Sequence, residues 1–145
     1  MLCMTPTAQA QRSNAGQFGL GVAIGTNGSG IESNMMFSSN ASVGMLFAFE
    51  TVSGGGNSAT ALQLSPYFRY EFGRDTHPFF QVGFDFTTSG GNSTSGLFMG
   101  VGILKDLGNG FALHADVDLL NATFTNGGQT AFGWGNGRIG CLWYF

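Results

Sequence analysis

The eight residues Arg138-Ile139-Gly140-Cys141-Leu142-Trp143-Tyr144-Phe145 decide the fold class of this chain. Alternate residues of a β-strand share a face. One face of this segment is therefore an apolar stripe that ends in two aromatic side chains: Ile139, Cys141, Trp143 and Phe145. The other face carries Arg138, Gly140, Leu142 and Tyr144. Such a stripe suits a strand whose outer face meets lipid and whose last aromatic residues lie among lipid headgroups.

The composition indicates one domain that is neither disordered nor an ordinary soluble protein. Charged residues make up 9% of the 145 residues, against roughly 25% in soluble domains. Glycine supplies 25 residues and phenylalanine 15, and ample apolar residues with little charge argue against disorder. The sequence contains no run of 18 apolar residues, so it predicts no transmembrane helix. The net charge is −3, and the basic residues are too scattered to bind nucleic acid: Arg12, Arg69, Arg74, Lys105 and Arg138.

The first residues look like the end of a secretory signal. Ala8-Gln9-Ala10 has the pattern of a signal-peptidase site. We therefore expect residues 1–10 to be a signal-peptide remnant and residues 11–145 to be the mature domain, with a disordered N-terminus as the alternative. Removal of Cys3 would leave Cys141 alone, so we expect no disulfide, no metal site and no cofactor.

Alternation of apolar with small or polar residues recurs in eight segments, which clusters of Gly, Ser, Asn and Thr separate. The predicted strands are 16–26, 30–37, 41–51, 60–72, 78–87, 96–104, 111–121 and 133–145. Strands of about 9–11 residues can cross a bilayer with tilt. An even number of strands places both ends of the domain on the same side.

The connections between these strands are of two kinds. The short ones are 38–40, 73–77 and 105–110. The uncharged ones, most of them longer, are 27–29, 52–59, 88–95 and 122–132. Outer-membrane barrels have short periplasmic turns and longer outer loops. The sequence therefore predicts long loops at the end opposite the C-terminus.

Alternation alone does not say which face is the core. In a soluble barrel of the lipocalin type, the Phe, Val and Leu stripe would surround a ligand. The opposite stripe, however, is rich in Gly, Ala and Ser, which suits the narrow interior of an eight-stranded barrel. Aromatic residues also gather at the predicted periplasmic ends of the strands, as in an aromatic girdle. We therefore predict an all-β, eight-stranded antiparallel up-and-down transmembrane β-barrel.

Two further stretches resemble the small outer-membrane β-barrel family typified by the OmpA and OmpX barrels. They are residues 64–73, LSPYFRYEFG, and residues 77–83, HPFFQVG. The final strand is similar to the family's C-terminal assembly signal, with Gly140, Trp143 and Phe145 at the matching positions. The resemblance implies a cell envelope protein of the Gram-negative outer membrane, in contact with membrane lipid and lipopolysaccharide and inserted by the barrel-assembly machinery. The family includes structural barrels, small channels, adhesins and a few lipid A-modifying enzymes.

The inward face collects the charged residues of the predicted strands. They are Glu50, Arg69, Glu71, Asp85, His114, Asp116, Asp118 and Arg138. Charges in a confined lumen need partners, so we expect a network of ion pairs. Counting residues from the periplasmic ends pairs Arg138 with Asp116 or Asp118. The network would plug and rigidify the barrel, and a small gated, porin-like pore is the alternative.

The sequence does not favour an enzyme. His114 and Asp116 share a face, but His114 counts to the periplasmic third of the barrel, away from the outer rim where lipid A deacylases of this shape act. The glycine runs 54–56 and 90–91 lack the Lys-Ser/Thr of a phosphate-binding loop. We therefore expect a structural or interaction role. A lipid A-modifying enzyme and a soluble lipocalin-like barrel are the less favoured alternatives, and an envelope protein partner is left open.

Overall fold

The computed structural model describes residues 15–26, 28–54, 57–73, 76–125 and 127–145, without the side chains of residues 50–59. The expected signal remnant, 1–10, lies outside this description, as do Arg12 and Arg74. The described residues form no helix, and so none that is long and apolar enough to cross a membrane. They form the strands β1 (Phe18–Gly25), β2 (Gly28–Met36), β3 (Ala41–Gly54), β4 (Asn57–Glu71), β5 (Thr76–Ser89), β6 (Asn92–Gly108), β7 (Phe111–Thr125), β8 (Thr130–Gly133) and β9 (Gly137–Tyr144).

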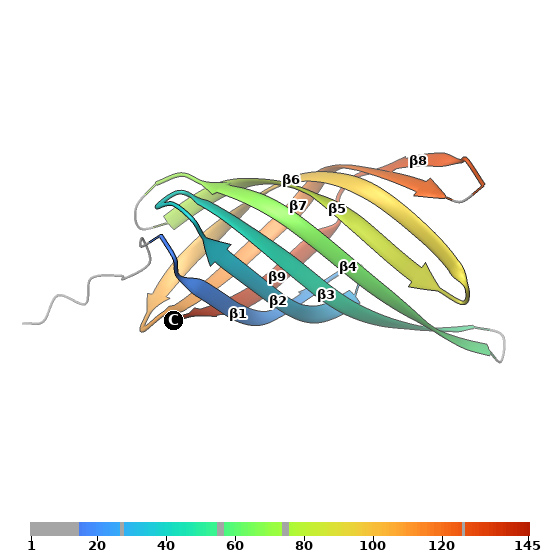
Figure 1. The fold of residues 1–145 in the computed structure, drawn as a ribbon, viewed down its shortest axis with the longest axis horizontal. Coiled ribbons are helices and arrows are strands. Elements are labelled where there is room, and N and C mark those ends of the chain that lie inside the picture. Colours follow the sequence, from blue (N-terminus) through green and yellow to red (C-terminus); the bar gives the residue numbers. More distant parts are fainter. Residues whose placement is uncertain (1–14, 27, 55–56, 74–75, 126) are drawn as a thin grey trace, which may run out of the picture.

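These strands close into an eight-stranded antiparallel up-and-down barrel (Figure 1). From β1 to β8, each strand pairs with the next along the chain. β9 closes the ring because it pairs with both β7 and β1. β8 and β9 occupy one position in the ring, since both pair with β7. The predicted strand 133–145 is thus two strands in line.

The break between β8 and β9 lies at residues 134–136. Gly135 has a φ of 83°, a left-handed conformation that glycine adopts at little cost. Asp118 of β7 holds the break through two backbone hydrogen bonds. Its N–H donates to the Asn136 carbonyl at 2.9 Å, and its carbonyl accepts from the Gly135 N–H at 2.8 Å. Backbone pairing to β7 therefore continues past the kink.

The prediction of long loops is wrong, because most of the residues at that end belong to strands. β5 and β6 remain paired up to Ser89 and Asn92. They turn on Gly90 and Gly91, whose φ values of 57° and 85° match a two-residue hairpin turn. The hairpins β3–β4 and β7–β8 are extended in the same way. Hairpins that project beyond the apolar part of the barrel need no apolar face. Their strands are therefore rich in Ser, Thr and Asn, a composition that is also typical of loops.

The two ends of the barrel differ. At the C-terminal end, β1 begins beside the last residue: the Phe18 N–H donates to the Phe145 carbonyl at 3.3 Å, and the Phe145 N–H donates to the Phe18 carbonyl at 3.0 Å. The links β2–β3, β4–β5 and β6–β7 lie at this end (Figure 1). The hairpins β3–β4, β5–β6 and β7–β8 project at the other end, called here the hairpin end. Both ends of the barrel chain therefore lie on one side, as predicted.

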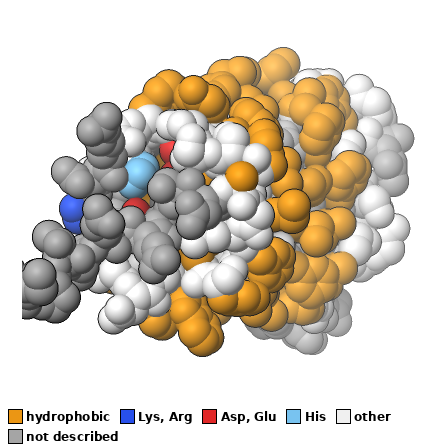
Figure 2. Space-filling model, turned by 60° about the vertical axis from the view of Figure 1, so that its left-hand side comes forward, with side chains coloured by type: hydrophobic (Ala, Val, Ile, Leu, Met, Phe, Trp, Pro, Cys, Tyr) orange, Lys and Arg blue, Asp and Glu red, His pale blue; other side chains and the backbone are white. Residues whose placement is uncertain are grey.

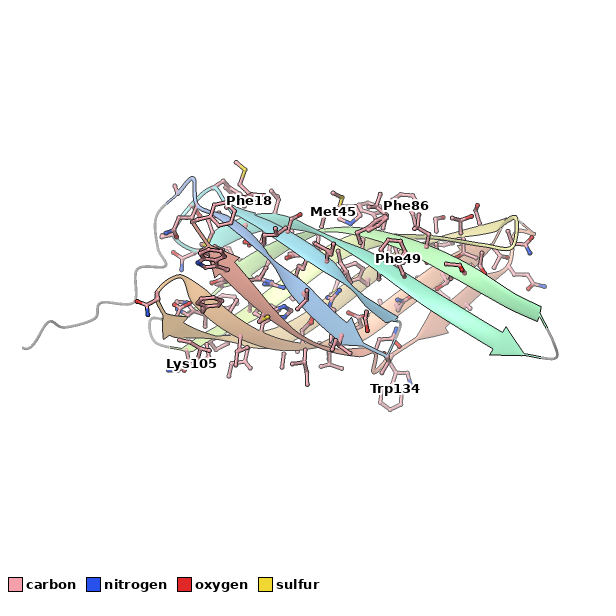
Figure 3. The ribbon with its side chains drawn as sticks, turned by 90° about the horizontal axis from the view of Figure 1, so that it is seen from below. Phe18, Met45, Phe49, Phe86, Lys105 and Trp134 are labelled. Carbon is pink, nitrogen blue, oxygen red and sulfur yellow. The ribbon has the colours of Figure 1, made fainter. Side chains whose placement is uncertain are left out.

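The apolar faces of the strands point outward, and the small and polar faces point into the lumen. Figure 2 shows the apolar side chains as a broad band across the face in view, and Phe18, Met45 and Phe86 point away from the barrel in Figure 3. We call this band the apolar belt. Its exposed members include Leu20, Val22, Ile24, Ile31, Val43, Met45, Phe68, Phe84, Leu97, Met99, Val101, Ile103, Leu113, Val117 and Ile139.

One residue points outward against the alternation of its strand. Continuing the inward positions His114, Asp116 and Asp118 along the predicted strand 111–121 places Leu120 in the lumen, but its side chain is 47% exposed. The register between β6 and β7 shifts between Met99, opposite Leu120, and Gly100, opposite Asp118. This β-bulge inserts Leu119 as an extra residue and reverses the alternation beyond it. As a result Asn121 is buried in the lumen.

Candidate functional site: the polar lumen

Glu32 of β2 lies at the centre of the lumen network, with 2% of its surface exposed. Its carboxylate accepts a hydrogen bond from the Tyr67 hydroxyl. The Nη2 group of Arg69 lies 3.3 Å from Oε1, and Nε2 of His114 lies 2.7 Å from Oε2. Tyr67 and Arg69 are alternate residues of β4, so both reach inward from one strand. The carboxylate thus joins β2, β4 and β7 across the lumen.

Arg69 is fully buried. Its guanidinium carbon lies 4.9 Å from the ring centre of Tyr67 and 4.2 Å from that of Phe79, within cation–π range. Nη2 also donates to the Gln81 amide oxygen at 3.4 Å. Nε and Nη1 have no hydrogen-bond partner among the described residues, and neither has Nδ1 of His114. Two aromatic faces and one carboxylate therefore stabilise this charge.

Arg138 of β9 pairs with Asp116, one of the two acids that the sequence predicted. Nε of Arg138 lies 3.0 Å from both carboxylate oxygens, and Nη2 lies 2.7 Å from Oδ1. Two-pronged contacts of this kind are the strong form of an arginine–carboxylate pair. The Gln81 amide also donates to Asp116 Oδ1 at 2.8 Å. Because Gln81 contacts Arg69 as well, the pair is continuous with the Glu32 cluster.

Asn34 ties further strands to this network. Its amide nitrogen donates to the Ser42 hydroxyl at 3.0 Å and to the Tyr67 hydroxyl at 3.2 Å. Its amide oxygen accepts from the Tyr144 hydroxyl at 3.2 Å. Asn34, Ser42, Tyr67 and Tyr144 come from β2, β3, β4 and β9. Polar contacts therefore cross the lumen between strands that are not neighbours in the ring.

The C-terminal end of the lumen is filled by apolar side chains. A buried cluster there consists of Met36, Phe79, Leu104, Ala112, Leu142 and Tyr144. Beside it His77 lies between two acids, with Nδ1 3.8 Å from Glu71 and Nε2 3.3 Å from Asp106. The sequence placed His77 in a turn, but β5 begins before it. The cluster separates the polar network from the C-terminal end.

The hairpin end of the lumen is more open. A cavity of about 200 Å³ is lined by polar side chains that include Gln63, Asp85 and Asn121. Asp85 accepts hydrogen bonds from the Gln63 amide at 3.1 Å, from the Ser65 hydroxyl and from the Asn121 amide at 3.5 Å. A second, smaller cavity is lined by Asp85, Asp118 and Arg138. We call these two cavities together the vestibule.

The structure divides the predicted lumen residues into groups. Arg69, His114, Asp116 and Arg138 belong to one continuous network. Asp85 and Asp118 line the vestibule, and Glu71 lies beside His77. His114 contacts Glu32, not Asp116 as its spacing suggested. The side chain of Glu50 lies outside the description.

Glu32 is the central residue that sequence reasoning missed. Strand 30–37 has the weakest alternation of the eight, because Ser33 stands among its outward residues. The sequence does contain an indication of this role. Ile31 and Met35 are apolar and share the outward face, which puts Glu32 and Asn34 on the inward face. The same alternation places Tyr67 on the inward face with Arg69, and Gln81 with Asp85, but neither was among the predicted network residues.

The three residues of the predicted assembly signal have defined places in the structure. Trp143 stacks on Phe111 with ring centres 5.7 Å apart and an interplanar angle of 5°. Phe145 meets Phe18 edge to face at 5.6 Å. Gly140 lies against His114, where a Cβ would come within 2.3 Å of Nε2. The glycine thus leaves room for the imidazole inside, and the two aromatic residues lie outside.

Comparison of the chain with protein-family models and with curated proteins finds no match. The described residues also contain no group of three His, Cys, Asp or Glu side chains that could hold a metal ion. The function is therefore inferred from the geometry of the barrel and its lumen.

Proposed function

We propose that this protein is an integral β-barrel of the bacterial outer membrane, with a structural or interaction role and a lumen closed by polar side chains. The apolar belt is the observation that carries the proposal. It combines exposed aliphatic and aromatic residues from every side of the ring. Exposed apolar patches on soluble monomers rarely exceed a few hundred Å². A belt around the whole barrel is what a lipid-facing surface requires.

The height of the belt supports the proposal. Along β4 and the residue that follows it, the outward side chains run from Leu62 to Phe72. A rise of about 3.3 Å per residue and a tilt of about 40° give this run a height of roughly 25 Å. The lipid-facing band of outer-membrane barrels is also about 25 Å tall.

Aromatic residues lie at both limits of the belt. At the C-terminal end they are Phe18, Tyr70, Phe72, Phe111, Trp143 and Phe145. Towards the hairpin end they are Phe49, Phe86, Phe124, Phe132 and Trp134. Two aromatic girdles bound the lipid-facing band of membrane barrels. The sequence predicted the first girdle, and the second is visible only when the strands are assembled.

The lumen argues against a soluble lipocalin-like barrel. That arrangement needs an apolar interior around a ligand and a polar outer surface. Here the interior holds Glu32, Arg69, His114 and Asp116, all buried. The outer surface is largely apolar.

Membrane fractionation combined with heat-modifiability tests the proposal. The protein should appear in the outer-membrane fraction, and unboiled samples in mild detergent should migrate differently from boiled ones, because the closed ring leaves no strand edge within the apolar belt from which unfolding can start. A protein in the soluble fraction whose boiled and unboiled samples co-migrate would overturn the proposal.

A small gated pore is the second candidate, because the vestibule reaches Arg138 from the hairpin end. Conduction would require the Arg138–Asp116 pair and the apolar cluster at the C-terminal end to part. Planar-bilayer recording decides between the two. Steady conductance of the parent protein would favour the pore, and a silent parent would favour the closed lumen.

A further inference from the structure

A large groove lies on the outside of the barrel, across β3 to β7, with a volume of about 630 Å³. Two outward rows of side chains form its walls. The strand register aligns the first row, which is Val43, Phe68, Val82, Met99 and Leu120. The second row is Pro66, Phe84, Leu97 and Ala122.

The chemistry of the groove is uniformly apolar. Its walls carry no charged, amide or hydroxyl side chain. Its floor is the backbone of the inward positions Gly44, Tyr67, Gly83 and Phe98. Each of β4, β5 and β6 is paired on both sides, so the groove offers no sheet edge to an added strand. An occupant must therefore bind through apolar contact alone.

The dimensions of the groove restrict that occupant further. Its two walls are outward rows two residues apart, which is about 7 Å along the strands. A helix with side chains is about 10–12 Å wide and does not fit between them. The groove crosses four interstrand spacings, so its length is about 19 Å. One leaflet, which an extended lipid chain spans, is about 15 Å thick. A single extended hydrocarbon chain therefore matches the groove in width and approximately in length.

We propose that this groove holds one acyl chain of a membrane lipid, and that the chain stays bound when the surrounding lipid is exchanged. The inference rests on the proposed membrane location of the barrel. The groove lies within the apolar belt and is continuous with it, so lipid chains reach it without leaving the hydrocarbon. A chain seated between two walls keeps contacts on three sides, whereas a chain on a convex part of the belt has contacts on one.

Two matched tryptophan variants test the proposal. Phe84 lines the groove on β5, and Val22 lies on β1, four positions away round the ring and outside the groove. Both side chains are 54% exposed. Phe84→Trp and Val22→Trp would be made in a background with Trp134→Phe and Trp143→Phe. Each protein is reconstituted in vesicles of phosphatidylcholine with brominated acyl chains, which quench nearby tryptophan, and is then extracted into dodecyl maltoside.

In the vesicles both tryptophans should be quenched. After extraction, quenching should persist for Phe84→Trp and disappear for Val22→Trp. Addition of Val82→Phe, which fills the groove, should remove the persistent quenching from Phe84→Trp. Loss of quenching at both positions on extraction, or persistence at both, would overturn the acyl-chain site while leaving the membrane location intact. No quenching in the vesicles at either position would overturn the membrane location itself, and the acyl-chain site with it.

Discussion

Gly44 lies directly beside the ring of Tyr67: a Cβ at this position would come within 2.2 Å of Tyr67 Cζ and 2.3 Å of its hydroxyl oxygen. The two residues are cross-strand partners on β3 and β4. The missing side chain of Gly44 thus provides the space through which Tyr67 reaches Glu32. Gly102 beside Phe79 and Gly83 beside Phe98 repeat the arrangement.

Replacing Gly44 with alanine should destabilise the barrel by about 1–3 kcal/mol, the usual cost of overpacking a filled interior. The Tyr67 ring would have to move and would lose its hydrogen bond to Glu32. Denaturant unfolding in lipid vesicles measures the change. Gly133→Ala is the control, because a Cβ there meets nothing within 4 Å. Equal unfolding free energies for the two variants would contradict the role of Gly44.

Glu32→Gln should be among the most damaging single changes in the lumen. It removes the charge that faces Arg69 and His114, and breaking a buried pair costs about 3–5 kcal/mol. Asp85→Asn is the matched control, because Asp85 accepts only from neutral donors in the vestibule. The free energy of unfolding of each variant checks the prediction. A larger loss for Asp85→Asn than for Glu32→Gln would show that Glu32 is not the centre of the network.

Arg138→Ala should destabilise the barrel and widen the path from the vestibule into the lumen. Removal of a buried partner of Asp116 costs about 3–5 kcal/mol, and water in the vestibule should reduce that value. Lys105→Ala, at an exposed position, should cost about 0–1 kcal/mol. Planar-bilayer recording should show conductance in Arg138→Ala and a silent parent. A parent that conducts steadily and is unchanged by the substitution would remove the closed-lumen proposal.

Val101→Arg should be far less stable than Thr87→Arg. Val101 is an outward residue near the middle of β6, where an arginine that faces the bilayer midplane costs roughly 2–4 kcal/mol. Thr87 lines the vestibule with Asp85, which can accept the new charge. Unfolding in lipid vesicles compares the two. Equal tolerance would mean that the belt does not face hydrocarbon.

Replacing Trp143 and Phe145 together with serine should block assembly into the membrane. The substitution removes the Phe111 stack and the Phe18 contact, and with them two aromatic residues of the C-terminal girdle. Phe132→Ser with Trp134→Ser, which removes two aromatic residues towards the hairpin end, is the control and should assemble. The amount of each protein in the outer-membrane fraction is the measurement. Normal levels of the first variant would refute the assembly role.

Most of the barrel could be predicted from the period of two along each strand, because an inward or outward assignment depends only on parity. The assignment fails at the bulge beside Leu120, where the backbone breaks the alternation, and the predicted strand 133–145 is interrupted by the kink at Gly135. Contacts across the lumen depend on the register between strands, which residue types do not specify. Parity places Gly102 inward and suggests that a serine there would be tolerated, yet a Cβ on Gly102 would lie 2.3 Å from the Phe79 ring.

The candidate network was predictable in its chemistry and only partly in its pairs. Counting along adjacent strands limited the partner of Arg138 to Asp116 or Asp118, and the structure pairs it with Asp116, which faces it across β7 and β9. The Glu32 cluster joins β2 to β7, which lie on different sides of the ring. Such a contact spans the lumen, so no count along neighbouring strands could find it.

If the barrel spans a membrane as proposed, the unequal heights of its strands limit how deep it can sit in the bilayer. β2 pairs with β3 only up to Phe49, opposite Ser29, so β3 continues above that level with one side unpaired by any described residue. Within the described chain β8 likewise pairs with β7 alone. Unpaired backbone N–H and C=O groups are not tolerated in hydrocarbon. In the proposed membrane setting, these unpaired edges limit the lipid tails to the level of Phe49, and the unpaired backbone above that level would lie among headgroups or in water.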